Sequence, residues 1–556
     1  MSGLKTALIL AAIAVVVGLP FVFQRSETTI GRSEDVVVVI TPHNEAIRHE
    51  FETAFRKWYR DKTGRTVDVD WRVIGGTNEI VRYLNSEFEN SFRNHWTGTH
   101  QGQWTPEVWQ GYSDGDLILP DDPEADGPAE AARRAFLDSN VSVGVDVFFG
   151  GGSYDFIKQA EIGTLVPWRD ASALAERFPE EVFPQQFAGE VFWDPEGRWI
   201  GAVLSSFGII YNVNSLERLG IGNAPTSWHD LADPRLFGEV ALADPTKSGS
   251  ITKAFEMIVQ EEMDALVDQA LADGLSPEEA EAQGVPAGWM DAMQWIQKIC
   301  ANARYFTDSA TKGPVDVASG DCAMGMSIDF YGRFQSEVIV ARGGGDRLRF
   351  VAPEGASTLS ADPIGILRGA PNANVADLFV EFVLSEEGQR LWGYRVGVEG
   401  GPVEYALRRS PVLRPIYEGD SRLLLSEPDV NPYENVRDFL YRPEWTGRLF
   451  TPLRFLIRVA FIDSHDELAE AWGAILHARE RGDRVAAEAA ESVFSDLSAI
   501  RFEVAAGEIA QILRSGDKIE EVRLSRTLAQ SFRRQYVRAK KIAEGQLPPS
   551  EAGRAH

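Results

Sequence analysis

The feature that most constrains the fold of this chain is a glycine-rich turn at residues 146–155. Its sequence is Asp-Val-Phe-Phe-Gly-Gly-Gly-Ser-Tyr-Asp, and it lies between a strand-like run and a helix-like run. The apolar, β-favouring run at 146–149 predicts the end of a strand, and residues 154–162 have helical spacing. Such a turn exposes backbone N–H groups at the N-terminus of a helix, where the dipole favours an anion or a polar ligand. Glycine-rich turns also simply close tight corners, so this stretch alone leaves both interpretations open.

Two further turns repeat this chemistry. Gly-Gly-Thr-Asn at 75–78 and Lys-Ser-Gly-Ser at 247–250 each follow a predicted strand and open a predicted helix. In open α/β sheets such turns gather at the carboxyl ends of the strands, where ligands bind. The three turns together therefore predict one site for a polar ligand, with an anion preferred.

Alternating strands and helices predict an α/β fold. A fully apolar run at 36–40, typical of a parallel sheet covered on both faces, precedes a helix at 45–62 and a strand at 67–73. Two apolar segments, 199–212 and 363–367, are candidates for strands that cross from one lobe to another.

Two regions depart from this alternation. The pattern loosens over about 92–140, which we interpret as an insertion with one or two helices, one of them at 130–137. Beyond about residue 418 the strand signals end and helical runs follow to about 544. Within 523–541, basic residues alternate with apolar ones, which indicates a solvated helix face packed on the body or a helix that touches a membrane or a partner.

Composition limits the function. A chain of 556 residues is too long for one hydrophobic core, so two or three domains are expected. The net charge of −28 disfavours binding of nucleic acid. The only cysteines, Cys300 and Cys322, lack metal-type spacing and either pair or remain buried thiols. No Gly-x-Ser-x-Gly, His-Glu-x-x-His or Walker motif is present, so we expect a binding protein with no cofactor rather than an enzyme.

The N-terminus carries an export signal. Lys5 precedes an uncharged apolar run over residues 6–23, and no small-x-small cleavage site follows it. We expect residues 1–25 to remain as a signal anchor that tethers a periplasmic body to the inner membrane, with Lys5 on the inside. A cleaved signal is the alternative.

Seven motifs, in this order and over about residues 36–417, resemble the periplasmic solute-binding proteins of ABC importers, in the group that binds ferric iron, phosphonates and sugar phosphates. They are Thr-Pro-His-Asn at 41–44, Gly-Gly-Thr-Asn-Glu at 75–79, Asp-Val-Phe-Phe-Gly-Gly-Gly at 146–152, Gly-Ile-Ile-Tyr-Asn at 208–212, Pro-Thr-Ser-Trp-His-Asp-Leu at 225–231, Ala-Ser-Gly-Asp-Cys-Ala-Met-Gly at 318–325 and Leu-Ser-Glu-Glu-Gly-Gln at 384–389.

The resemblance implies a type II-like periplasmic-binding-protein fold with two α/β lobes that close on the ligand by hinge motion. Lobe 1 would comprise 35–205 with the insertion at about 92–140, lobe 2 would comprise 206–354, and 355–418 would return to lobe 1. Residues 419–556 would form a helical C-terminal extension outside the resemblance. The implied partners are a small solute and an ABC transporter permease, and we expect a monomer.

The family's ferric branch binds iron through two adjacent tyrosines, a histidine and a carboxylate, but here Phe330 replaces one tyrosine. We therefore expect an oxyanion, such as a phosphonate or phosphate ester, with iron bound by His43 and Tyr331 as the alternative. The expected ligand-binding residues are His43, Asn44, Gly76, Thr77, Asn78, Gly151, Gly152, Ser153, Ser205, Ser206, Ser248, Gly249, Ser250, Asp329 and Tyr331. A ligand-binding sensor or adaptor, and an enzyme on the same fold, are the other functions left open.

Overall fold

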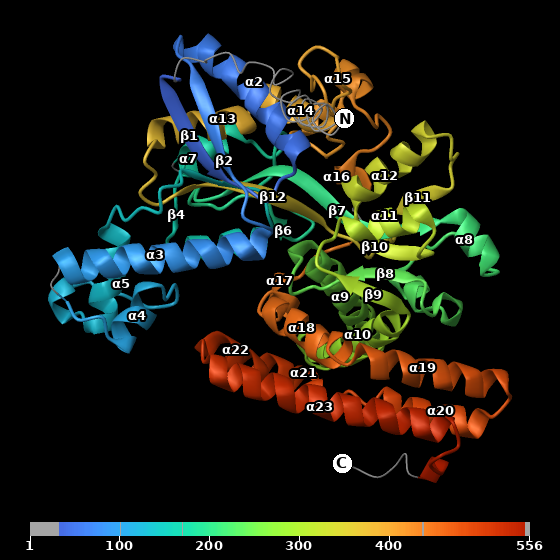
Figure 1. Ribbon diagram of the computed structural model, residues 1–556. Coiled ribbons are helices and arrows are strands. Elements are labelled where there is room, and N and C mark those ends of the chain that lie inside the picture. The colour runs from blue at the N-terminus through green and yellow to red at the C-terminus, as the bar shows by residue number, and fades with distance from the viewer. Residues whose placement is uncertain (1–32, 100–101, 170, 436–438, 551–556) are drawn as a thin grey trace, which may run out of the picture.

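The computed structural model describes residues 33–99, 102–169, 171–435 and 439–550 (Figure 1). The expected anchor at 1–25 lies outside these ranges. Among the helices of the described residues, none is both long enough and apolar enough to cross a membrane.

The described strands build one mixed sheet and a small hairpin. The sheet has the order β2-β1-β3-β12-β7-β10-β8-β9, with β11 beside β7 and β4 beside β12. Its strands are β1 (Asp35–Ile40), β2 (Val67–Arg72), β3 (Val147–Phe149), β4 (Leu165–Val166), β7 (Ile200–Asn212), β8 (Val240–Ala243), β9 (Ala303–Thr307), β10 (Met324–Ile328), β11 (Leu348–Val351) and β12 (Leu359–Leu367). The hairpin pairs β5 (Gln186–Phe187) with β6 (Glu190–Val191).

Strand β7 joins two halves of this sheet. Its beginning pairs antiparallel with β12, with Ser206 opposite Leu359, and its end pairs with β10 and β11. We call the β2-β1-β3-β12 side the first half and the β10-β8-β9 side the second half. Every residue of β7 is buried, as an apolar strand covered on both faces requires. The segment expected to cross between lobes is therefore one continuous strand.

Helices cover both faces of the first half and enclose two hydrophobic cores. Asn44 begins the first of them, because its side chain accepts the N–H of Ile47 at 3.1 Å. The helices are α2 (Glu45–Thr63), α3 (Thr77–Thr99), α4 (Pro106–Tyr112), α5 (Pro128–Asp138), α6 (Ser153–Ile162), α7 (Ala171–Arg177), α13 (Ala373–Val383), α14 (Glu386–Gly393) and α15 (Gly419–Leu424).

The expected insertion needs one correction. Helix α3 continues past residue 92 to Thr99, and Phe92 and Trp96 lie on its buried face. The irregular stretch therefore begins after α3 and contains α4 and α5, which pack against the end of that helix through Tyr112 and Phe136.

The second half is built around a long antiparallel helix pair, α9 and α10. Its helices are α8 (Val213–Arg218), η2 (Trp228–Ala232), α9 (Gly249–Ala272), α10 (Pro277–Ala301), α11 (Lys312–Ser319) and α12 (Asp329–Ala341). Cys300 and Cys322 are buried here as free thiols, so the disulfide that the sequence left open does not form.

The C-terminal helices share the hydrophobic core of the second half and lie beneath it in Figure 1. Trp289 donates to Ile500 O at 2.8 Å, and Trp472 donates to Asn302 Oδ1 at 3.0 Å. Leu528, Phe532 and Tyr536 of the basic segment are buried, so its apolar face packs on the body. These helices are α17 (Pro443–Thr446), α18 (Phe450–Ile457), α19 (His465–Glu480), α20 (Arg484–Phe494), α21 (Phe502–Val504), α22 (Ala510–Ser515) and α23 (Lys518–Ala543). Helix α16 (Pro432–Asn435) belongs instead to the core of the first half, through Tyr433.

Candidate functional site

The three glycine-rich turns meet where the two halves face each other. A Cβ on Gly151, whose φ is +133°, would lie 2.8 Å from Thr77 Cγ2, so the turns of the first half are in contact. Asn78 donates to Thr246 O at 2.9 Å, which links the first half to the turn before α9. The three turns therefore lie close together, and the hydrogen bond from Asn78 joins the two halves at this point.

A cavity of about 1420 Å³ opens beside these turns. The N-termini of α6 and α9, one from each half, both contribute to its lining through Gly152 and Gly249. Helix N-termini carry free N–H donors and a partial positive charge. The remaining principal lining groups are Ser153, Asp155, Glu190, Ser250, Lys253, Glu256, Ser360, Asp362, Tyr441, Arg448, Phe450, Thr451 and Arg514.

Asp155 places a carboxylate between the two helix N-termini. Its Oδ2 would lie 3.8 Å from a Cβ on Gly152 and 3.9 Å from a Cβ on Gly249. Burial raises the pKa of Asp155 to about 6, and the nearby Arg454 partly opposes this rise. The carboxyl group therefore titrates close to neutral pH, at the point where an external anion would meet the two helices.

Lys253 bridges the halves within the cavity wall. Its Nζ lies 2.7 Å from Glu190 Oε1 of β6 and 2.9 Å from Glu256 Oε2 of its own helix, and 3.5 Å from the ring centre of Tyr441. Burial lowers the pKa of Lys253, but the two carboxylates outweigh burial and raise it. Tyr441 and Thr446 donate to the other oxygen of Glu256, at 2.9 and 2.6 Å. The ammonium group thus stays charged and paired.

The C-terminal region forms one wall of the cavity and reaches the first half. The Tyr154 hydroxyl lies 3.1 Å from Thr451 Oγ1, and its ring lies 4.6 Å from that of Phe450. Arg454 of α18 donates to Asn78 Oδ1 at 3.3 Å. Helix α18 therefore contacts the first half although its core belongs with the second.

His43 does not line the cavity. It is buried against the rings of Phe149 and Trp392, at 4.7 and 5.7 Å, and a Cβ on Gly150 would clash with its Nε2. Burial, and secondarily the charge of Arg409, hold the pKa of His43 well below its usual value. A neutral imidazole in an aromatic setting contributes to the core of the first half.

Arg409 lies where Ser205, His43 and Tyr331 were expected to meet a ligand. Its guanidinium donates to Ser205 Oγ at 2.6 Å and to Asp362 Oδ2 at 2.5 Å. Burial raises the pKa of Tyr331, and the charge of Arg409 opposes that rise. A resident guanidinium beside both Tyr331 and His43 disfavours a ferric ion between them.

Several expected ligand residues have structural partners instead. Ser248 caps α9 by accepting the N–H of Ile251 at 3.3 Å, and Asn44 caps α2. Asp329 accepts the N–H of Phe330 at 2.8 Å, while Ser206 is buried in the pairing of β7 with β12. Of the expected residues, Gly152, Ser153, Gly249 and Ser250 line the cavity, and Gly76, Thr77, Asn78 and Gly151 form the adjoining turns.

The sequence analysis missed the charged lining. Asp155 lies two residues beyond a predicted site residue, and an acidic residue in the first turn of a helix was the available signal. Lys253 and Glu256 lie one turn apart on α9, but Glu190 and Tyr441 join them from distant segments that carry no motif.

The chain is similar in sequence to one bacterial protein whose function is not described. A protein of Haemophilus influenzae described as uncharacterized is 26% identical over 249 residues, which are 44% of this chain and 60% of that protein. The present chain therefore matches 60% of the length of this relative.

Solved structures of similar chains have low sequence identity. The periplasmic binding protein AfuA from Actinobacillus pleuropneumoniae, with bound fructose-6-phosphate, is 18% identical with a TM-score of 0.43, covering 75% of this chain and 98% of that one. Iron-bound HitA from Pseudomonas aeruginosa is 15% identical with a TM-score of 0.44 and the same coverage of 75% and 98%. Residues 138–398 match the model of the family described as bacterial extracellular solute-binding protein.

Proposed function

We propose that this chain is the substrate-binding component of an ABC importer and holds a small anionic solute in the cavity between the two halves. The observation that carries this proposal is the convergence of two helix N-termini, of α6 and α9, from opposite halves on one cavity. The halves then act as the two lobes of a type II periplasmic binding protein, divided as 35–205 with 355–418 and 206–354. The match of residues 138–398 to the model of a solute-binding family supports this assignment.

The donors of the site suit an oxyanion such as a phosphonate or a phosphate ester. Backbone N–H groups at Gly152 and Gly249 and the hydroxyls of Ser153 and Ser250 lie at its two sides. Asp155 opposes an anion when ionised and donates a hydrogen bond when protonated. Because its pKa is about 6, anion binding and protonation of Asp155 are expected to be coupled.

The pH dependence of binding tests this function. We expect inorganic phosphate and a sugar phosphate to bind Asp155→Asn more tightly than the wild type. The ratio of the two affinities should grow about tenfold per pH unit from pH 6 to 8, because the wild type must take up a proton. Comparing two proteins with the same ligand cancels the titration of the ligand itself. Asp116→Asn, which removes an exposed carboxylate from the same cavity, is the matched control.

A cationic solute is the second candidate, since carboxylates outnumber basic groups around the cavity. They are Glu89, Asp114, Asp116, Asp155, Glu161, Glu190, Glu256 and Asp362, against Lys158, Lys253, Arg448 and Arg514. For a cation, such as an amine or ferric iron supplied as its citrate complex, Asp155→Asn would weaken binding above pH 6. Tighter binding of an amine or iron by the wild type, without phosphate binding, would replace the anion assignment.

A further inference from the structure

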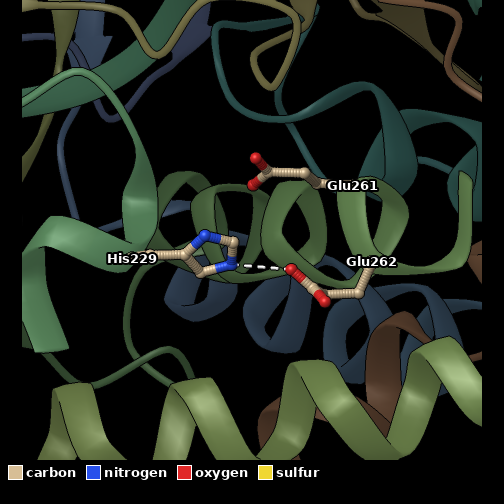
Figure 2. Close-up of side chains that lie close together, drawn as sticks. All are labelled: His229, Glu261 and Glu262. Carbon is tan, nitrogen blue, oxygen red and sulfur yellow. Dashed lines mark hydrogen bonds and ion pairs between the residues drawn. The ribbon is translucent and has the colours of Figure 1, made fainter. Parts of the chain in front are cut away.

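His229, Glu261 and Glu262 form a cluster in the second half that does not line the cavity (Figure 2). His229 belongs to η2, and the two glutamates are neighbours on α9. One ligand atom from each residue lies within 4.8 Å of the other two. We propose that this cluster binds a divalent transition-metal ion, with Zn²⁺ as the ion its geometry fits best, and so joins η2 to α9.

The imidazole of His229 is held in an orientation that suits a metal ligand. Ser227 Oγ lies 3.2 Å from Nδ1, and the ring of Trp295 lies 4.3 Å from the imidazole. A hydroxyl can accept the Nδ1–H bond, which leaves the lone pair of Nε2 free. Metal-bound histidines usually have such a partner on the second ring nitrogen, because it fixes the tautomer and the ring orientation. Nε2 faces the glutamates, 2.6 Å from Glu262 Oε1.

The ion pair between His229 and Glu262 leaves Glu261 without a role. Its Oε2 is inaccessible to solvent and has no hydrogen-bond partner. A carboxylate oxygen that is shielded from solvent and has no partner is costly, and a cation shared with Glu262 and His229 would satisfy it. Figure 2 shows the Glu261 carboxylate above the imidazole of His229, and the dashed line joins His229 to Glu262.

The dimensions and ligand types favour Zn²⁺. Bonds of about 2.1 Å in a tetrahedral site place ligand atoms about 3.4 Å apart. The present separations, from 2.6 Å to at most 4.8 Å, bracket that value. A nitrogen donor with two carboxylates suits zinc better than Ca²⁺ or Mg²⁺, which prefer oxygen ligands alone.

Zinc titration of the chain without an affinity tag tests this proposal. We expect one Zn²⁺ per chain by calorimetry near neutral pH, and a Co²⁺ absorption spectrum typical of low coordination number. His229→Ala and Glu261→Gln should each weaken Zn²⁺ binding at least tenfold, and Ser227→Ala about tenfold through loss of ligand orientation. Thermal melting without metal shows that each variant is folded.

Glu480→Gln is the matched control. Glu480 lies 3.1 Å from His477 in an exposed pair outside the cluster, so its loss should leave Zn²⁺ binding unchanged. Absence of stoichiometric Zn²⁺ binding by the wild type would overturn the proposal. Wild-type affinity in both His229→Ala and Glu261→Gln would overturn it as well, because the ion would then lie elsewhere.

Discussion

Replacing Asp155 with asparagine should stabilise the protein at pH 7 and leave its stability almost unchanged at pH 4. The pKa of this carboxyl rises from 3.8 to about 6 on folding, chiefly through burial. A raised pKa means that the folded state holds the proton more tightly than the unfolded state. The resulting stability is fully present below about pH 3.8 and is lost as the pH rises toward 6.

The size of this effect follows from the shift. About two pKa units at 1.36 kcal/mol each give about 3 kcal/mol of lost stability at pH 7 in the wild type, a loss that the neutral asparagine avoids. An unfolding entropy of about 2.1 cal/mol/K per residue over 556 residues is about 1.2 kcal/mol/K. The melting temperature of the variant at pH 7 should therefore exceed that of the wild type by about 2.5 °C.

Thermal melting of both proteins in steps from pH 4 to pH 8 provides the measurement. We expect the difference in melting temperature to rise between pH 4 and pH 6 and then to level off. Asp116→Asn controls for the loss of one negative charge from the same cavity. A difference that stays constant over this range, or that falls with rising pH, would refute the assignment of Asp155 as a buried carboxyl with a raised pKa.

Two more substitutions test the charges around the cavity. Lys253→Met leaves Glu190 and Glu256 buried without their cation and should destabilise the protein by about 3–5 kcal/mol, measured by urea unfolding at pH 7. A loss under about 1 kcal/mol would show that the bridge between the halves is not needed. Arg454→Ala removes the cation that opposes the raised pKa of Asp155. The pH range over which stability is lost should then move upward in a melting series, and an unmoved or lowered range would contradict the pairing.

Local patterns in the sequence predict the positions of most strands and helices that carry the turns. The strand expected at 36–40 is β1, and the helix expected at 45–62 is α2, because an apolar strand and an Asn44 cap act over a few residues. The extent of α3 was misjudged although the signal was present. Phe92 and Trp96 continue its apolar face at four-residue intervals, but the surrounding glycines and tryptophans were interpreted as an irregular insertion.

The candidate site depended on contacts that no local pattern contains. Motif order placed His43 and Tyr331 at the ligand, but Arg409, far along the chain, lies beside both of them. The conformation of the glycine turns is set locally, as the positive φ of Gly150 and Gly151 shows, so these turns are visible in the sequence. The residues that set the charge of the cavity come from separate segments, so only the folded chain brings them together.

The helices beyond α16 contact both halves beside the cavity, so any movement of the halves would act on them. Buried bonds, Trp289 to Ile500 and Gln297 to Phe494, attach these helices to the second half, where breaking the bonds would expose a shared core. The bonds that α18 makes to the first half, between Tyr154 and Thr451 and from Arg454 to Asn78, are only partly buried. If the halves separate to admit a solute, the hydrogen bonds to the first half cost less free energy to break than those to the second half. The C-terminal helices should therefore move with the second half, and α18 should uncover the cavity as they do.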